Sequence, residues 1–148
     1  MTHAELVARA AQWLRKTVGC QVVLTEHVAT TQTGEIPDAI GWCASLCYLV
    51  ECKMSRTDLR ADLRKRFRRP GNAALGDFRF YLAPKDVLRP DDIPSGWGLY
   101  EVHGRRVIHR SGEAWATPVE YGGRRAIVRH YRKPHDSHQH DEIALLVS

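Results

Sequence analysis

Two acidic residues and a lysine in the first half of the chain have the types and the spacing to act on a phosphodiester. Asp38 is separated by twelve residues from the triplet Glu51-Cys52-Lys53. Mg²⁺ binds hard oxygen ligands, usually one or two carboxylates with waters, and neutralises charge on a scissile phosphate. Asp38 and Glu51 could supply the carboxylates, and the backbone carbonyl of Cys52 could be a third ligand. The ammonium of Lys53 could orient or deprotonate an attacking water, or stabilise the pentavalent phosphate.

Adjacent strands must bring these groups together. The run from Leu46 to Val50 is short, apolar and rich in branched and aromatic residues, which predicts a buried strand over residues 46–54. Side chains alternate along a strand, so Glu51 and Lys53 should emerge on the same side. A strand over residues 36–43 would place Asp38 beside them. Charged groups at the end of a buried strand lose hydration unless they serve each other or a metal, so we expect a shared site.

The remaining pattern alternates helices and strands, which predicts an α/β fold with a mixed central sheet flanked by helices. Thr2 and Glu5 match a capping box that opens the first helix, and Gly19 follows its end. After residue 110 we expect a strand-rich C-terminal extension, partly flexible, over residues 111–148. The other expected elements are helices over 4–17, 55–68 and 141–147, strands over 20–26, 78–83 and 99–102, and a hairpin partner over 105–110.

The chain as a whole has the composition of one globular domain of 148 residues with a net charge of +5. No stretch approaches the roughly 20 apolar residues of a membrane span, and no secretory signal opens the sequence. We therefore expect a cytoplasmic protein without a membrane partner. Its four cysteines form no C-x-x-C pair, so we expect buried thiols and not a zinc site.

With these elements placed, the chain resembles the PD-(D/E)XK nuclease superfamily, whose fold is the restriction-endonuclease-like αβββαβ core. The resemblance rests on Pro37-Asp38 and Glu51-Cys52-Lys53 in their strand context, and it covers about residues 5–102. The continuations over residues 50–62 and 79–84 are similar to a bacterial and phage branch that includes MmcB-like DNA-repair endonucleases.

The resemblance implies Mg²⁺-dependent cleavage of DNA, with Mn²⁺ as a possible substitute, in DNA repair or in the DNA processing of a phage or mobile element. It implies Asp38 and Glu51 as ligands and Lys53 as the catalytic cation. A first-helix glutamate joins the metal site in many members, and Glu5 is the residue that could match, with Glu26 as a weaker substitute. Duplex cutters of this fold often pair protomers, so a homodimer is possible.

Basic residues follow the triplet directly. Arg56, Arg60 and Arg64 fall at intervals of four, with Lys65 beside them, and like charges at that spacing repel mildly. A phosphate backbone would explain them, so we expect these four residues to contact DNA, although a solvated helix face is the alternative. A second basic cluster runs from Arg124 to Lys133.

Other readings of the sequence stay open beside the nuclease. One is a non-catalytic DNA-binding module on the same fold, and another is a regulatory or scaffold protein of a phage or mobile element that binds protein through its basic, histidine-rich tail. Asp62 and Arg66 fit an ion pair one helical turn apart. We expect a mobile segment, and not a metal site, around the irregularly spaced His130, His135, His138 and His140.

Overall fold

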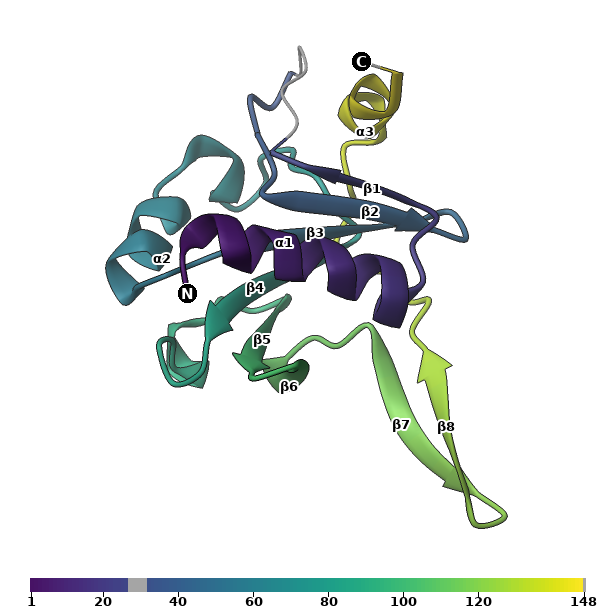
Figure 1. Cartoon of the computed structure of the whole chain (residues 1–148). Coiled ribbons are helices and arrows are strands. Elements are labelled where there is room, and N and C mark those ends of the chain that lie inside the picture. The colour runs from purple at the N-terminus through teal and green to yellow at the C-terminus, as the bar shows by residue number, and fades with distance from the viewer. Residues whose placement is uncertain (27–31, 148) are drawn as a thin grey trace.

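The computed structural model describes residues 1–26 and 32–147, and within them it confirms an α/β fold with a mixed sheet and three helices. The helices are α1 (His3–Trp13), α2 (Arg56–Leu63) and α3 (Gln139–Val147). The strands are β1 (Val22–Thr25), β2 (Ala39–Cys43), β3 (Leu46–Cys52), β4 (Phe78–Pro84), β5 (Trp97–His103), β6 (Arg106–Gly112), β7 (Ala116–Tyr121) and β8 (Arg124–Arg129). Figure 1 shows α1 lying across one face of the sheet.

The main sheet has six strands in the order β1-β2-β3-β4-β5-β6. The first three strands are antiparallel, β4 and β5 each run parallel to the strand before them, and β6 returns antiparallel to β5. The helix α2 makes the crossover between the parallel strands β3 and β4, as parallel pairs require. Strands β7 and β8 form a separate two-stranded sheet.

Helix α1 begins as expected and buries one side. Thr2 and Glu5 form the capping box, with the Thr2 hydroxyl accepting from the Glu5 N–H at 3.2 Å. A π-helical turn over Leu14–Val18 continues the helix, and Gly19 ends it with a φ of 85°, which glycine adopts without strain. The apolar side chains of α1 pack on the sheet face that carries Tyr48, Val50, Phe80 and Tyr100.

The opposite face of the sheet has its own apolar cluster, which includes Leu49, Tyr81 and Leu99. Leu59 of α2 and Leu145 of α3 pack into this second cluster. Alternate residues of β3 and β4 therefore enter different clusters, as expected for strands that are covered on both sides. The charged end of β3 emerges on the side that α2 covers.

Three expected boundaries were wrong near the site. The second strand begins at Ala39 and not at residue 36, and the third ends at Cys52. Helix α2 ends at Leu63 and not near residue 68, because the backbone becomes extended at Lys65 (φ −64°, ψ 146°) before a 3₁₀ turn over Arg66–Arg68. This break turns the chain back, so that Arg68 reaches the residues that α2 covers.

The C-terminal extension contains the hairpin β7–β8 and the closing helix α3, which confirms its strands and the expected helix. The carbonyls of Ala114 and Gly96 accept hydrogen bonds from the rings of His130 and His135, at 2.8 and 2.7 Å. In the described residues no group of three or more His, Cys, Asp or Glu side chains could hold a metal, and the side chain of His140 lies outside them. The expected mobility stays a prediction.

All four cysteines are buried and free of disulfides. Burial raises the pKa of Cys20 to about 12, with Cys43 adding to the shift and Arg129 opposing it. In residues 1–26 and 32–147 there is no helix of the length and apolar character needed to cross a bilayer.

Candidate active site

The two predicted acidic residues lie opposite each other in the chain pairing, where β2 begins and β3 ends. Ala39 pairs with Val50, so Asp38 and Glu51 are the next residues along the two antiparallel chains. The Asp38 Oδ2 accepts a hydrogen bond of 2.7 Å from the Cys52 N–H. Lys53 Nζ lies 3.3 Å from Glu51 Oε2, so both side chains emerge on one side, as the strand alternation predicted. The structure therefore places Asp38 opposite Glu51 in the strand register and Lys53 beside Glu51.

The carbonyl of Cys52 faces the same end of the sheet. The Lys53 N–H donates to the Leu82 carbonyl on β4 at 2.9 Å. The peptide bonds of the described chain are trans, so the carbonyl of Cys52 points away from β4 and toward the β2 side, where Asp38 lies. Carboxylate and carbonyl oxygens are the donor types that Mg²⁺ prefers, usually with water in the other positions.

A buried ion cluster surrounds Glu51 under α2. Arg68 is its centre: the guanidinium lies 3.3 Å from Glu51 Oε1, donates to Asp62 Oδ2 at 2.9 Å and contacts the Glu35 carboxylate. Lys53 Nζ lies 3.4 Å from Asp62 Oδ1. The side chains of Glu51 and Arg68 are 3% and 1% exposed. Such ions are tolerated inside a protein only when each is paired, so these groups hold one another in place.

Further hydrogen bonds tie the cluster to the fold. The Tyr81 hydroxyl donates to Asp62 Oδ2 at 2.7 Å, and Glu35 Oε2 accepts from the Leu75 N–H at 2.8 Å. The Arg68 guanidinium also lies 4.7 Å from the Trp97 ring centroid. Positions of the charged groups are therefore fixed from several strands and loops at once.

Burial sets the protonation of this site. It raises the pKa of Glu51 to about 8, against Arg68, with Asp38 adding to the rise. Burial alone would lower the pKa of Lys53, but Glu51, Asp62 and Asp38 outweigh it and raise that pKa. Lys53 remains a cation at neutral pH beside Asp62 and Asp38 while Glu51 holds its proton, which a bound divalent cation would displace.

The protonation of Glu51 gives a pH prediction for protein in chelator. Folded Glu51 keeps its proton to about pH 8, whereas the unfolded group releases it near 4.5. Between these values the folded state binds more protons, so the free energy of unfolding should fall as pH rises, by on the order of a few kcal/mol. Urea titrations at pH 5 and pH 8 measure it. Glu51→Gln should flatten the dependence, and an unchanged slope in this variant would contradict the assignment.

The first-helix glutamate expected at the site is engaged in the capping box. Glu5 Oε2 accepts from the Thr2 N–H at 2.7 Å. Its role as a metal ligand stays a prediction, and metal binding would compete with this capping hydrogen bond. Another residue of α1 faces Asp38 instead: His3 Nε2 lies 3.6 Å from Asp38 Oδ2. The His3 Nδ1 lies 3.9 Å from Glu26 Oε1, which brings the weaker substitute Glu26 to the same edge.

The four residues expected to contact DNA have different surroundings. Arg56 forms a two-bond pair with Asp92, at 2.9 and 2.7 Å. Lys65 Nζ lies 3.1 Å from Asp62 Oδ1. Arg60 and Arg64 are exposed, and in the described residues neither has a carboxylate within 4.0 Å. Arg60 in α2 and Arg64 at its C-terminal cap are therefore available to bind phosphate.

Sequence reasoning missed the centre of the cluster. The expected ion pair of Asp62 with Arg66 was wrong, because Asp62 turns inward to Lys53, Arg68 and Tyr81. The available signal was the position of Asp62 between Leu59 and Leu63, since a lone acid inside an apolar stripe needs a partner. Glu35 and Arg68 carried no comparable signal.

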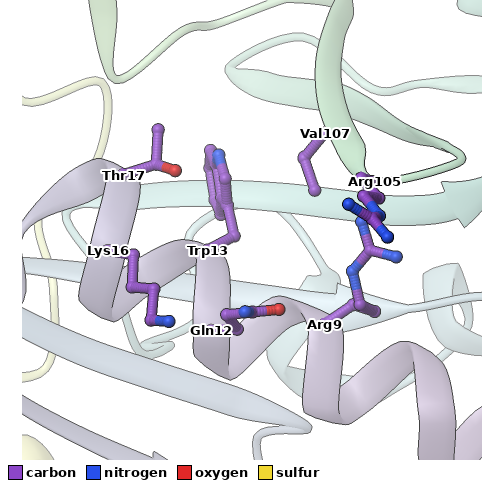
Figure 2. A pocket seen from close by; sticks show the side chains of 7 residues that line it. All are labelled: Arg9, Gln12, Trp13, Lys16, Thr17, Arg105 and Val107. Carbon is purple, nitrogen blue, oxygen red and sulfur yellow. The ribbon is translucent and has the colours of Figure 1, made fainter.

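A hollow lies on the α1 face of the sheet, between α1 and the β5–β6 turn (Figure 2). Its lining residues are Arg9, Gln12, Trp13, Lys16, Thr17, Arg105 and Val107. Arg9 Nη1 donates to the Gly104 carbonyl at 2.8 Å, so this guanidinium holds the turn against α1. Trp13 is buried against Phe80 and Tyr100 and offers no open ring face. The hollow is thus part of the packing between α1 and the turn.

No family model, curated protein or solved structure matches this chain.

Proposed function

We propose that this protein is a divalent-metal-dependent nuclease that hydrolyses DNA phosphodiester bonds, in DNA repair or in the DNA processing of a phage or mobile element. One observation carries the proposal: Asp38 and Glu51 are opposite residues where β2 begins and β3 ends, with Lys53 Nζ 3.3 Å from Glu51 Oε2. Hard oxygen donors beside a fixed cation are what this hydrolysis requires.

The topology supports a restriction-endonuclease-like core as part of the proposal. Helix α1, the antiparallel strands β1–β3, helix α2 and the parallel strand β4 follow one another in the order αβββαβ. Asp38 and Glu51 lie where β2 begins and β3 ends, beside the start of the crossover that contains α2. This is the arrangement that the sequence resemblance implies.

The residues of the chain have distinct parts in the proposed reaction. Bound Mg²⁺ would supply charge neutralisation and a more acidic water. Asp38 is oriented by the Cys52 N–H, and its carboxylate would be a ligand together with Glu51 and the Cys52 carbonyl. Because the pKa of Lys53 is raised, its ammonium would donate to a phosphate oxygen and not remove a proton from water.

The test is a cleavage panel with purified protein. Linear duplex, nicked, branched and single-stranded DNA, with a matched RNA, would be incubated with Mg²⁺, Mn²⁺ or chelator. We expect metal-dependent cleavage of at least one DNA form and none in chelator. Protein that is inert on every DNA form with both metals would refute the enzyme.

A second candidate, a non-catalytic DNA-binding module, is favoured by one observation. Both carboxylate oxygens of Glu51 already lie 3.3 Å from a cation, Lys53 at one and Arg68 at the other. A site that serves only stability would look the same. The two candidates differ in metal binding, since only the nuclease should gain thermal stability from Mg²⁺ in a way that Glu51→Gln removes.

We also predict that α2 contacts the DNA backbone through Arg60 and Arg64. Replacing both by glutamate should weaken binding uniformly across sequences and reduce the slope of log affinity against log salt by at least about 1.8, two phosphates at 0.9 each. Fluorescence anisotropy over a KCl series measures the slope. The same double change at the exposed pair Arg105 and Arg106 is the control, and an equal loss there would remove α2 from the interface.

A further inference from the structure

The hairpin β7–β8 forms an arm whose outer half is exposed on both faces. Its strands are joined by Gly122 and Gly123, with φ of 57° and 74°, the positive values that a tight two-residue hairpin turn requires. Figure 1 shows it projecting away from the six-stranded sheet. A lone two-stranded hairpin is marginally stable in water, so contact with a partner would stabilise the arm.

Both faces of the arm are open to solvent. The residues from Glu120 to Val128 are all exposed, including Tyr121 at 86% and Ile127 at 62%. Because side chains alternate, Tyr121 and Ile127 belong to opposite faces in the register, and both faces are exposed over residues 120–128.

The arm carries a net positive charge. Between residues 124 and 133 the chain has four arginines, one lysine and no acid. Arg124 and Arg125 lie at the turn, exposed, with no carboxylate within 4.0 Å in the described residues. The single acid of the two strands is Glu120, opposite Arg125. The outer half of the arm is therefore an unpaired cationic surface.

The base of the arm is fixed, unlike its tip. Arg129 Nη1 donates to the Tyr48 hydroxyl at 2.9 Å, and its other nitrogen donates to the Val18 carbonyl. The same guanidinium lies 5.1 Å from the Trp115 ring centroid. These bonds join the arm to the C-terminal end of the π-helical turn, so it projects in a defined direction and not as a loose tail.

We infer that the β7–β8 arm binds duplex DNA, with the ribbon in the major groove and Arg124 and Arg125 on phosphates. The inference rests on the proposed function, which makes DNA the substrate, and adds the element that grips it away from the cut. A major groove admits a two-stranded ribbon, and a surface of net positive charge complements a polyanion. Tyr121, at the tip, adds an aromatic contact within the groove.

The arm and the carboxylates lie at opposite ends of α1. His3 contacts Asp38, whereas Val18 contacts Arg129, and the intervening helical chain is roughly 22 Å long at 1.5 Å per residue. The arm therefore does not reach the reacting phosphate. Its loss should weaken binding and raise KM while leaving the single-turnover rate at saturating protein unchanged.

The experiment compares the full chain, Arg124→Gln/Arg125→Gln and the control Arg105→Gln/Arg106→Gln. Both pairs follow a glycine at a hairpin turn, so the two variants lose equal charge in similar settings. Anisotropy of a fluorescein-labelled 30-bp duplex is measured in chelator over a KCl series. The arm variant should lose about 1.8 from the salt slope and roughly 10- to 100-fold in affinity at low salt, and the control should keep both. Circular dichroism checks that each variant is folded.

The remaining outcomes overturn the arm or leave it standing independently of the nuclease. The DNA-binding role of the arm is refuted if the arm variant and wild type have equal salt slopes. It is also refuted if the arm variant and the control variant lose affinity equally. Dissociation of a dimer by Ile127→Glu, with unchanged DNA binding, assigns the arm to a second copy of the chain and also refutes it. Binding in chelator needs no cleavage, so an inert protein whose arm variant loses slope keeps the arm and rejects the enzyme.

Discussion

Replacing Arg68 by methionine is expected to destabilise the protein by about 3–5 kcal/mol. The arginine side chain is 1% exposed and joins the carboxyl groups of Glu35, Glu51 and Asp62. Its removal leaves these buried acids facing one another, and only Lys53 and Lys65 are left near Asp62. Breaking a buried pair costs far more than an exposed pair contributes, because the abandoned charge has lost its hydration. The free energy of unfolding from urea titration measures the change.

Two matched variants make this result specific. Arg69→Met changes the exposed neighbour of Arg68 and should shift the free energy of unfolding by less than about 0.5 kcal/mol. Arg68→Lys keeps the charge but not the planar fork that meets three carboxyl groups, so it should restore only part of the loss. A cost below about 1 kcal/mol for Arg68→Met would mean that the cluster is not the support of the site.

The part of the site that the sequence predicts is the part set by local geometry. Side chains alternate along any strand, so Glu51 and Lys53 had to share a side once residues 46–50 were recognised as a buried strand. The position of Asp38 followed from an antiparallel neighbour with a short connection. Both inferences need only periodicity and turn length.

The part that sequence reasoning missed depends on where the chain turns back. Continuing α2 through residue 68 would have carried Arg68 away from Glu51. The extended backbone at Lys65 returns it to the sheet. Glu35 meets Arg68 across 33 positions of sequence, and no periodicity reports such a pair. The break is favoured by burial of a guanidinium among acids, a tertiary effect that outweighs local helix preference.

The buried cluster also bears on whether the site is catalytic. A purely structural network needs balanced charge, and Lys53 with Arg68 balances two carboxylates if Glu51 is protonated. The raised pKa of Glu51 fits that balance, because the protonated Glu51 carries no charge that a cation must neutralise. An acid held neutral beside Asp38, at a sheet end with an oriented carbonyl, can take up a divalent cation by releasing a proton. The charge of Asp38 is then the feature that a nuclease needs and a non-catalytic DNA-binding module does not.

Asp38→Asn is expected to lower the single-turnover rate of metal-dependent cleavage by about 10²–10³-fold or more. The asparagine carbonyl can still accept the Cys52 N–H that Asp38 Oδ2 accepts at 2.7 Å, so the local fold should persist while the ligand charge is lost. Glu51→Gln and Lys53→Met should abolish cleavage similarly, although their burial makes a stability check necessary. The control is Asp91→Asn, an exposed aspartate outside the site, which should cleave as wild type.

Binding measured in chelator completes the Asp38 experiment. Removing a negative charge next to a phosphate cannot weaken DNA affinity by electrostatics, so Asp38→Asn should bind as tightly as wild type or more tightly. Full cleavage by Asp38→Asn would exclude this carboxylate from the chemistry. A parallel loss of binding and cleavage, with the melting temperature lowered, would instead give Asp38 the structural role of closing the end of β2 and β3.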